Sequence, residues 1–171
     1  MAATPETSVR ERLLTAASDL FYREGIRAVG VQRVIEEAEA AKASLYSHFP
    51  SKDDLVAAYL ERMSAGTQGL LEEAVTRAGP DPRRQILALF DAIDEWGRSP
   101  DFRGCPFTNA CSELADEEHA GRAAIDRHRG WLRDRIDQLA RATGSDDPPL
   151  LGRAILLLLD GATSATILDR D

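Results

Sequence analysis

The sequence contains little cysteine, no long apolar run and few lysines. Its two cysteines, Cys105 and Cys111, are too few for a disulfide framework or a zinc-ligand quartet. The longest uninterrupted apolar run, at 154–159, has six residues, whereas a membrane span needs about 18 or more. The first eight residues are polar and lack the apolar core of a secretory signal. These absences predict a cytoplasmic protein with no membrane partner.

The residues that are present are typical of a globular helical protein. Of the 171 residues, 43% are hydrophobic and 29% are charged, which is too apolar for a disordered chain. Apolar residues recur with the helical period, and no segment is convincing as a strand. We therefore expect an all-α fold, with helices between Ser8 and Gly25 and at 31–38, 42–48, 52–77, 82–97, 117–142 and 150–167, and a short helix entered through 103–111.

Local signals mark several helix ends. Ser8 opens a capping-box pattern, Gly25 suits the residue after a helix, and Ser51 can cap the long helix that follows it. Pro82 suits the first turn of a helix. The last expected helix, at 150–167, is apolar on most of its circumference, so it must be buried in a core or against another subunit.

One segment carries a specific motif. Residues 25–52 read GIRAVGVQRVIEEAEAAKASLYSHFPSK, which is two short helices with a tight turn, followed by Leu45-Tyr46-x-His48-Phe49 and Ser51-Lys52. In order and spacing this segment resembles the helix-turn-helix of the TetR (TetR/AcrR) family of transcriptional repressors, over about residues 8–63. The resemblance implies a helix-turn-helix DNA-binding domain at 1–51 and a helical ligand-binding and dimerisation domain at 52–171.

The second short helix has the composition of a DNA recognition helix. With Leu45 turned inward, its outward residues are Lys42, Ala43, Ser44, Tyr46 and His48. Ser44 can hydrogen-bond a base edge or a phosphate, and Ala43 can pack on a thymine methyl group. The resemblance implies that Tyr46 and His48 contact phosphates of double-stranded operator DNA.

Three further residues are candidates for DNA contacts. Lys52 adds positive charge at the N-terminus of the next helix, where the helix dipole also favours a phosphate. Gln32 and Arg33, on the helix before the turn, either touch the DNA backbone or face solvent.

The motif departs from the usual family pattern at several positions. Val29-Gly30 lacks the hydroxyl of the Thr that usually caps the first of the two short helices. Glu39 occupies the turn where Gly is usual, and Ala41 stands where Ser or Thr usually caps the recognition helix. These departures predict a weaker or unusual operator interaction, because Glu39 also brings negative charge close to the DNA.

The second half resembles one branch of the family, through FRGCPFTNACSEL at 102–114. Members bury a small molecule among the middle helices and dimerise through the last two. The residues that could line such a cavity are Phe90, Trp96, Cys105, Phe107, Asn109, His128 and Trp131. The aromatic ones are equally explained as core packing, and His128, on an Arg-rich helix face, is expected to be exposed. Cys105 is either a reactive thiolate before a helix start or a small buried side chain.

No catalytic, metal or cofactor site is predicted. No nucleophile is paired with a base at a recognisable spacing, and no glycine-rich phosphate loop occurs. The acidic cluster at 113–119 contains one Asp116-x-x-His119 pair, whereas a di-metal bundle needs two Glu-x-x-His pairs. A solvated helix N-terminus explains the cluster better.

The resemblance implies a regulator and not an enzyme. The expected protein is a ligand-responsive repressor that binds a palindromic operator as a homodimer and is released by a small-molecule effector. The alternative is a helix-turn-helix protein repurposed for protein interaction, with weak DNA binding.

Basic charge is scarce but unevenly placed. The net charge is −8, from 21 Lys+Arg and 29 Asp+Glu, which counts against a protein that coats nucleic acid. Residues 1–62 have a net charge of −2 and residues 63–171 a net charge of −6, and the two lysines, Lys42 and Lys52, both lie in the first part. The charge therefore allows DNA binding but predicts little non-specific affinity.

Overall fold

The computed structural model describes residues 8–169, and these form eight α-helices without a strand, which confirms the expected all-α class. In chain order the helices are α1 (Val9–Glu24), α2 (Val31–Glu37), α3 (Lys42–His48), α4 (Lys52–Arg77), α5 (Pro82–Gly97), α6 (Pro106–Glu113), α7 (Ala120–Ala142) and α8 (Pro148–Leu168). The expected order of helices is therefore confirmed.

Side-chain caps explain where most of these helices begin. Ser8 Oγ accepts from the backbone nitrogen of Glu11 at 3.2 Å, and Ser51 Oγ accepts from that of Asp54 at 3.0 Å. α7 begins three residues later than expected, because residues 117–119 form a turn and His119 Nδ1 accepts from the backbone nitrogen of Gly121 at 3.0 Å.

The apolar side chains form two buried clusters that share α4. The first cluster joins α1, α2, α3 and the first part of α4 to residues of α6 and the start of α7. The second cluster joins the last part of α4 to α5, α7 and α8. α4 therefore connects the two clusters, because it contributes buried residues to both.

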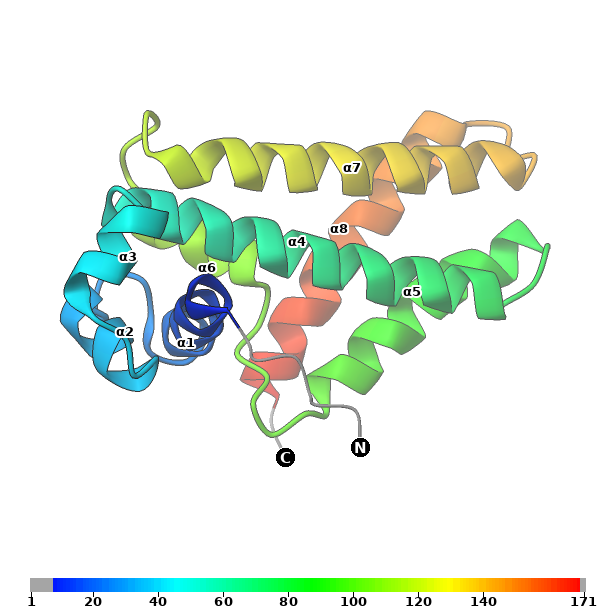
Figure 1. Ribbon diagram of the computed structural model, residues 1–171. Helices are drawn as coiled ribbons and strands as arrows, with labels where there is room; N and C mark the ends of the chain where they lie inside the picture. Colours follow the sequence, from blue (N-terminus) through cyan, green and yellow to red (C-terminus); the bar gives the residue numbers. More distant parts are fainter. Residues whose placement is uncertain (1–7, 170–171) are drawn as a thin grey trace.

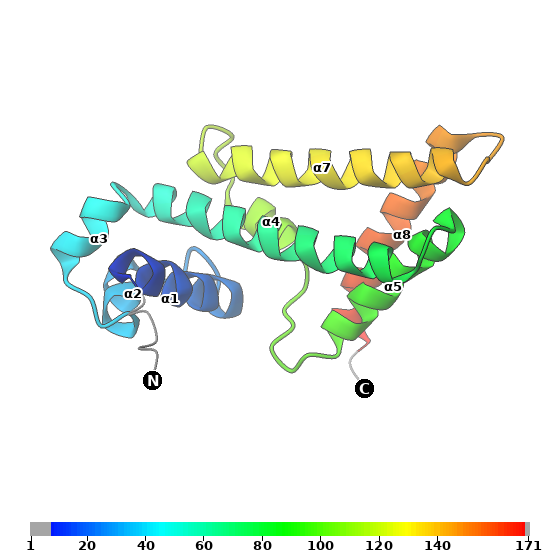
Figure 2. The same ribbon diagram turned by 45° about the vertical axis from the view of Figure 1, so that its right-hand side comes forward.

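The long helices are arranged around α4. Figure 1 shows α7 lying along α4, with α1, α2 and α3 gathered at one end. Seen after a turn of 45°, α5 and α8 lie beneath the other end of this pair (Figure 2). α6 lies under α4, close to α1, so it stands between the two ends of the molecule (Figure 1).

α8 buries one side and exposes the other. Gly152, Ile155, Leu159 and Thr163 face the interior. The exposed apolar positions Leu150, Ala154, Leu157, Gly161, Ala165 and Leu168 recur at the spacing of one helical stripe, with Leu157 70% exposed. By length and composition α8 could also cross a membrane, and it is the one helix within residues 8–169 that could. Of the 18-residue apolar segment of α8 that meets this criterion, 22% is buried. One such helix is weak evidence for a membrane.

Candidate functional site

The α2–turn–α3 unit is held by side chains turned toward α1. Val34, Ile35 and Leu45 are buried, and Leu45 is fully covered. The chain turns between the helices at Glu39, whose φ of 47° lies in the left-handed region that favours glycine. Glycine is usual at this turn in the family that the sequence resembles, and the positive φ at Glu39 explains that preference.

The exposed face of α3 presents the predicted DNA-contacting residues together. Lys42, Ala43 and His48 are exposed, Tyr46 is 42% exposed, and Ser44 is half-buried. The backbone nitrogens at the start of α3 have no side-chain cap, because its N-cap residue is Ala41. No side chain therefore competes with a phosphate for the backbone nitrogens of Lys42 and Ala43, whereas that of Ser44 donates to the carbonyl oxygen of Ala41 at 2.9 Å.

The two candidates on α2 point to solvent but already have partners. Gln32 Nε2 donates to Glu36 Oε1 at 3.0 Å, and Arg33 Nη2 donates to Glu24 Oε1 at 3.4 Å. Both pairs are exposed, so each side chain can exchange its carboxylate partner for a phosphate at little cost.

Lys52 is turned inward in this structure. Its Nζ donates to the carbonyl oxygen of Ile26 at 2.6 Å and lies 5.9 Å from the centre of the Phe21 ring. Burial lowers the pKa of Lys52, while Asp53 and Glu113 oppose that shift. The sequence predicted that Lys52 contacts a DNA phosphate. In this structure its ammonium group binds the loop between α1 and α2, and two of its hydrogens stay available for other partners.

Two contacts missed from the sequence join this DNA-binding head (α1, α2, α3 and the start of α4) to the rest. Tyr22 Oη of α1 donates to the carbonyl oxygen of Gly104 at 2.9 Å and accepts from the backbone nitrogen of Arg103 at 2.9 Å. Glu113 Oε2 of α6 accepts from the backbone nitrogen of Arg27 at 2.7 Å. These partners lie more than 80 positions apart in sequence, so no local sequence pattern could predict the contacts.

A cavity of about 540 Å³ opens on the other side of α6, among α4, α5, α6, α7 and α8. Its lining contains five of the seven residues singled out from the sequence: Trp96, Cys105, Phe107, Asn109 and His128. Phe90 and Trp131 lie outside the lining and pack half-buried against the second apolar cluster. Leu70, Leu71, Ile93, Ile125, Leu132 and Leu159 supply most of the remaining apolar wall.

The expectation that His128 is exposed is wrong, because its side chain is 5% exposed. The ring stacks on Phe107 with centroids 3.6 Å apart and planes 9° from parallel, and Nδ1 lies 3.0 Å from Ser64 Oγ. Burial, with a smaller contribution from Arg129, lowers the pKa of His128 to about 4. The ring is therefore neutral at pH 7.

The charged and thiol groups of the cavity wall are partly paired. Arg129 donates through both terminal nitrogens to Asp160, at 2.8 and 2.7 Å, which raises the pKa of Arg129. Cys105 is half-buried and Cys111 is exposed, and both are free thiols. Arg122 Nη1 donates to Cys111 Sγ at 3.0 Å. Within residues 8–169 no group of three or more His, Cys, Asp or Glu side chains is placed to hold a metal ion.

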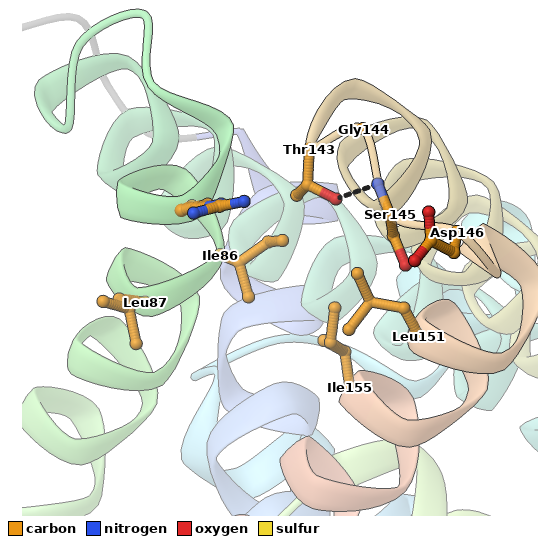
Figure 3. Close-up of a pocket in the computed structure, with 9 residues that line it drawn as sticks. Ile86, Leu87, Thr143, Gly144, Ser145, Asp146, Leu151 and Ile155 are labelled. Carbon is orange, nitrogen blue, oxygen red and sulfur yellow. Dashed lines mark hydrogen bonds between the residues drawn. The ribbon is translucent and has the colours of Figure 1, made fainter.

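A second, open cavity of about 580 Å³ lies at the end of the bundle, between α5 and the loop that joins α7 to α8. Figure 3 shows Ile86, Leu87, Leu151 and Ile155 around it, with a hydrogen bond from the Ser145 nitrogen to Thr143 Oγ1. None of the residues predicted from the sequence lines it.

Known proteins resemble this chain in sequence and in fold. The model of the family described as bacterial regulatory proteins, tetR family, matches residues 13–59. The crystal structure of SCO4454, a TetR-family transcriptional regulator from Streptomyces coelicolor, is 38% identical, with a TM-score of 0.86 over 94% of this chain and 84% of that chain. The HTH-type transcriptional repressor DhaR from Mycobacterium sp. strain GP1 is 30% identical over 67% of this chain and 55% of DhaR. The HTH-type transcriptional activator FasR from Mycolicibacterium smegmatis is 33% identical over 52% of this chain and 40% of FasR.

The two short helices seated on α1, with α3 exposed, define a helix-turn-helix DNA-binding protein. Its similarity to SCO4454 extends over nearly the whole chain, through the helical domain beyond the head. The chain belongs to the TetR family of bacterial transcriptional regulators. The expected family is therefore confirmed, and the role of its relatives is regulatory and not enzymatic.

Proposed function

We propose that the protein is a ligand-responsive transcriptional repressor, released from its operator by a small-molecule effector. The position of α6 between the cavity and the head carries this proposal. Phe107 and Asn109 of α6 line the cavity, while Glu113 of the same helix holds the loop ahead of α2. A molecule in the cavity therefore acts on a helix against which the DNA-binding head is packed.

The DNA-binding domain, residues 1–51, lies in the head and supplies the contacts with double-stranded DNA. Ala43 and Ser44 reach base edges in the major groove, and Lys42, Tyr46 and His48 contact phosphates. Gln32 and Arg33 add backbone contacts from α2, and Lys52 positions the loop beside them. Few of these groups carry charge, so affinity depends on two heads binding together.

The two heads belong to a homodimer formed by residues 52–171 through the exposed stripe of α8. Leu157 of this stripe and the adjacent Leu158, 70% and 62% exposed, supply the apolar surface that a stable subunit interface needs. In a symmetric dimer the two α3 helices enter successive major grooves about 34 Å apart, which requires a palindromic operator. A cytoplasmic location follows from this target.

The effector releases DNA by favouring a conformation in which the two α3 helices miss this spacing. Its leverage equals the difference between its affinities for the two conformations, so a tight ligand that does not distinguish them has no effect. α6 is the element that distinguishes them, because it contacts both the cavity and the head.

Fluorescence anisotropy with promoter DNA flanking the protein's own gene tests the proposal. We expect salt-sensitive binding that is lost in the Lys42→Ala, Tyr46→Ala double variant and kept in Arg84→Ala, which removes an exposed charge from α5. A reporter driven by the same promoter separates repression from activation. If no protein concentration produces a salt-sensitive increase in anisotropy, the proposal is contradicted.

A second candidate is a helix-turn-helix protein that binds a protein partner and binds DNA weakly. The exposed Glu39 in the turn and the missing side-chain caps of α2 and α3 favour it. Regulation that survives in the Lys42→Ala, Tyr46→Ala variant supports this second candidate, because DNA contact through α3 is then not the mechanism.

A further inference from the structure

The cavity wall contains one buried ring with an uncommitted hydrogen-bonding atom. His128 is 5% exposed and lines the cavity. Phe107 covers one face of the ring, and Ser64 of α4 lies 3.0 Å from Nδ1. The one hydrogen bond of the ring within residues 8–169 is at Nδ1, so the opposite nitrogen, Nε2, has no partner there.

The neighbours of His128 favour one of its two neutral tautomers. Gln68 Nε2 donates to Ser64 Oγ at 3.0 Å. The Ser64 hydroxyl has one hydrogen, and His128 Nδ1 is the acceptor it finds in the described part of the chain. Ser64 therefore donates to Nδ1, and a neutral imidazole that accepts at Nδ1 carries its hydrogen on Nε2. Burial and Arg129 hold the pKa of His128 near 4, so this neutral form is present at pH 7.

The Nε2–H group opens into the cavity. In the described residues it is not among the fully buried side-chain atoms that lack a hydrogen-bond partner, so it keeps accessible surface. Because the residue as a whole is buried and lines the cavity, that surface belongs to the cavity. A ligand that fills the cavity covers this donor, and an acceptor on the ligand avoids the cost of leaving it unpaired.

The rest of the wall restricts the shape and charge of the ligand. Three aromatic rings belong to the wall: Trp96 on α5 and the stacked rings of Phe107 and His128. Two arginines and two carboxylates line the cavity, so their formal charges cancel, and Arg129 is bound to Asp160 through two hydrogen bonds. The charged residues of the wall are Arg122, Asp126, Arg129 and Asp160. The wall therefore favours a flat molecule without a strong charge.

We propose that Nε2–H of His128 donates a hydrogen bond to the effector, which is a planar, largely apolar molecule with an sp² acceptor such as a carbonyl oxygen. This inference rests on the proposed function, because it takes the molecule in the cavity to be the effector. His128 selects ligands that have such an acceptor. Ser64, which accepts a hydrogen bond from Gln68, keeps the ring in the tautomer that donates from Nε2.

Nitrogen-15 NMR of the histidine side chains tests the tautomer without any ligand. We expect His128 Nε2 to resonate as a protonated, pyrrole-type nitrogen and Nδ1 as a pyridine-type nitrogen. In Ser64→Ala the ring loses the donor that fixes this state, so the two tautomers become mixed. A proton found on Nδ1 in the unmodified protein overturns the inference.

Two matched probes, 9-fluorenone and fluorene, test the hydrogen bond by isothermal titration calorimetry. They share a flat tricyclic frame, and fluorenone alone has a carbonyl oxygen. A neutral hydrogen bond contributes about 0.5–1.5 kcal/mol, so we expect fluorenone to bind about 2- to 12-fold more tightly than fluorene. His128→Phe, which keeps a flat ring, removes this preference, and His48→Phe, on the exposed face of α3, keeps it.

Each outcome decides the inference. A preference that survives in His128→Phe overturns it, and so does equal or undetectable binding of the two probes by the unmodified protein. Should His128→Phe fail to fold, Ser64→Ala must still reduce the preference. If fluorenone is preferred through His128 but does not release promoter DNA, the hydrogen bond stands and the proposed effector role fails.

Discussion

Glu113 Oε2, at the end of α6, accepts a 2.7 Å hydrogen bond from the backbone nitrogen of Arg27, in the loop between α1 and α2. The same loop receives Lys52 Nζ at the carbonyl oxygen of Ile26. One carboxylate and one ammonium group thus hold a loop that has no regular structure of its own. Because α6 also lines the cavity, Glu113 connects the cavity wall to the entrance of the helix-turn-helix.

Replacing Glu113 should loosen this connection. Glu113→Ala removes the acceptor, and we expect the free energy of unfolding to fall by about 1 kcal/mol, since the bond is charged but lies near the surface. Glu113→Gln keeps an oxygen acceptor and should lose less. Urea denaturation measures both, with the exposed Glu117→Ala as control. Equal stability of Glu113→Ala and Glu117→Ala contradicts the assignment.

The burial of His128 predicts a pH dependence of stability. Its pKa is lowered from 6.5 to about 4, so between these values the unfolded chain binds a proton that the folded protein does not. Stability therefore falls as the pH drops below 6.5 and stops falling, for this group, near pH 4. Between pH 7.5 and 5 we expect a loss of roughly 1–2 kcal/mol that is absent from His128→Phe.

The difference between the two unfolding curves is the measurement, because the carboxylates titrate alike in both proteins. Urea denaturation at intervals between pH 7.5 and 5 supplies it. A difference in unfolding free energy that stays constant over this range means that His128 titrates normally in the folded protein.

The features that depend on neighbouring residues, such as helix starts and the helix-turn-helix segment, were predictable from the sequence. Ser8 and Ser51 are ordinary caps, so the starts of α1 and α4 were predictable, whereas the start of α7 was misplaced because histidine is not a usual cap. The HTH segment was recognisable because its spacing is local. Whether DNA is bound through the predicted residues stays a prediction.

The sequence could not predict what depends on distant contacts. His128 lies between two arginines, which suggested an exposed face, but neighbours in a helix point about 100° apart and say little of each other's burial. Its burial comes from α6, through Phe107, and from α4, through Ser64. Lys52 likewise turns toward a backbone oxygen 26 positions away, which its exposed-helix pattern does not reveal.

The turn residue Glu39 should be open to improvement. A residue with a Cβ is strained at a φ of 47°, so Glu39→Gly should raise the free energy of unfolding by up to about 1 kcal/mol. The same change removes negative charge beside α3, so DNA should also bind more tightly. Glu39→Ala separates these effects, because it removes the charge but keeps the strain. Thermal denaturation and anisotropy measure the two. A Glu39→Gly protein no more stable than Glu39→Ala contradicts the strain argument.

The exposed stripe of α8 predicts how the proposed homodimer can be broken. Leu157→Glu places a carboxylate in the proposed interface twice, once from each symmetric copy, and the two charges lie without a partner in an apolar contact. Burying an unpaired charge costs several kcal/mol, so we expect dimerisation to weaken by about 100-fold or more. Leu87→Glu is the matched control, because Leu87 is 62% exposed but belongs to α5 and not to the stripe. Sedimentation velocity should find a dimer for the unmodified protein and for Leu87→Glu, and a monomer for Leu157→Glu. A Leu157→Glu protein that stays dimeric excludes this face as the interface, and an unmodified protein that sediments as a monomer contradicts the homodimer itself.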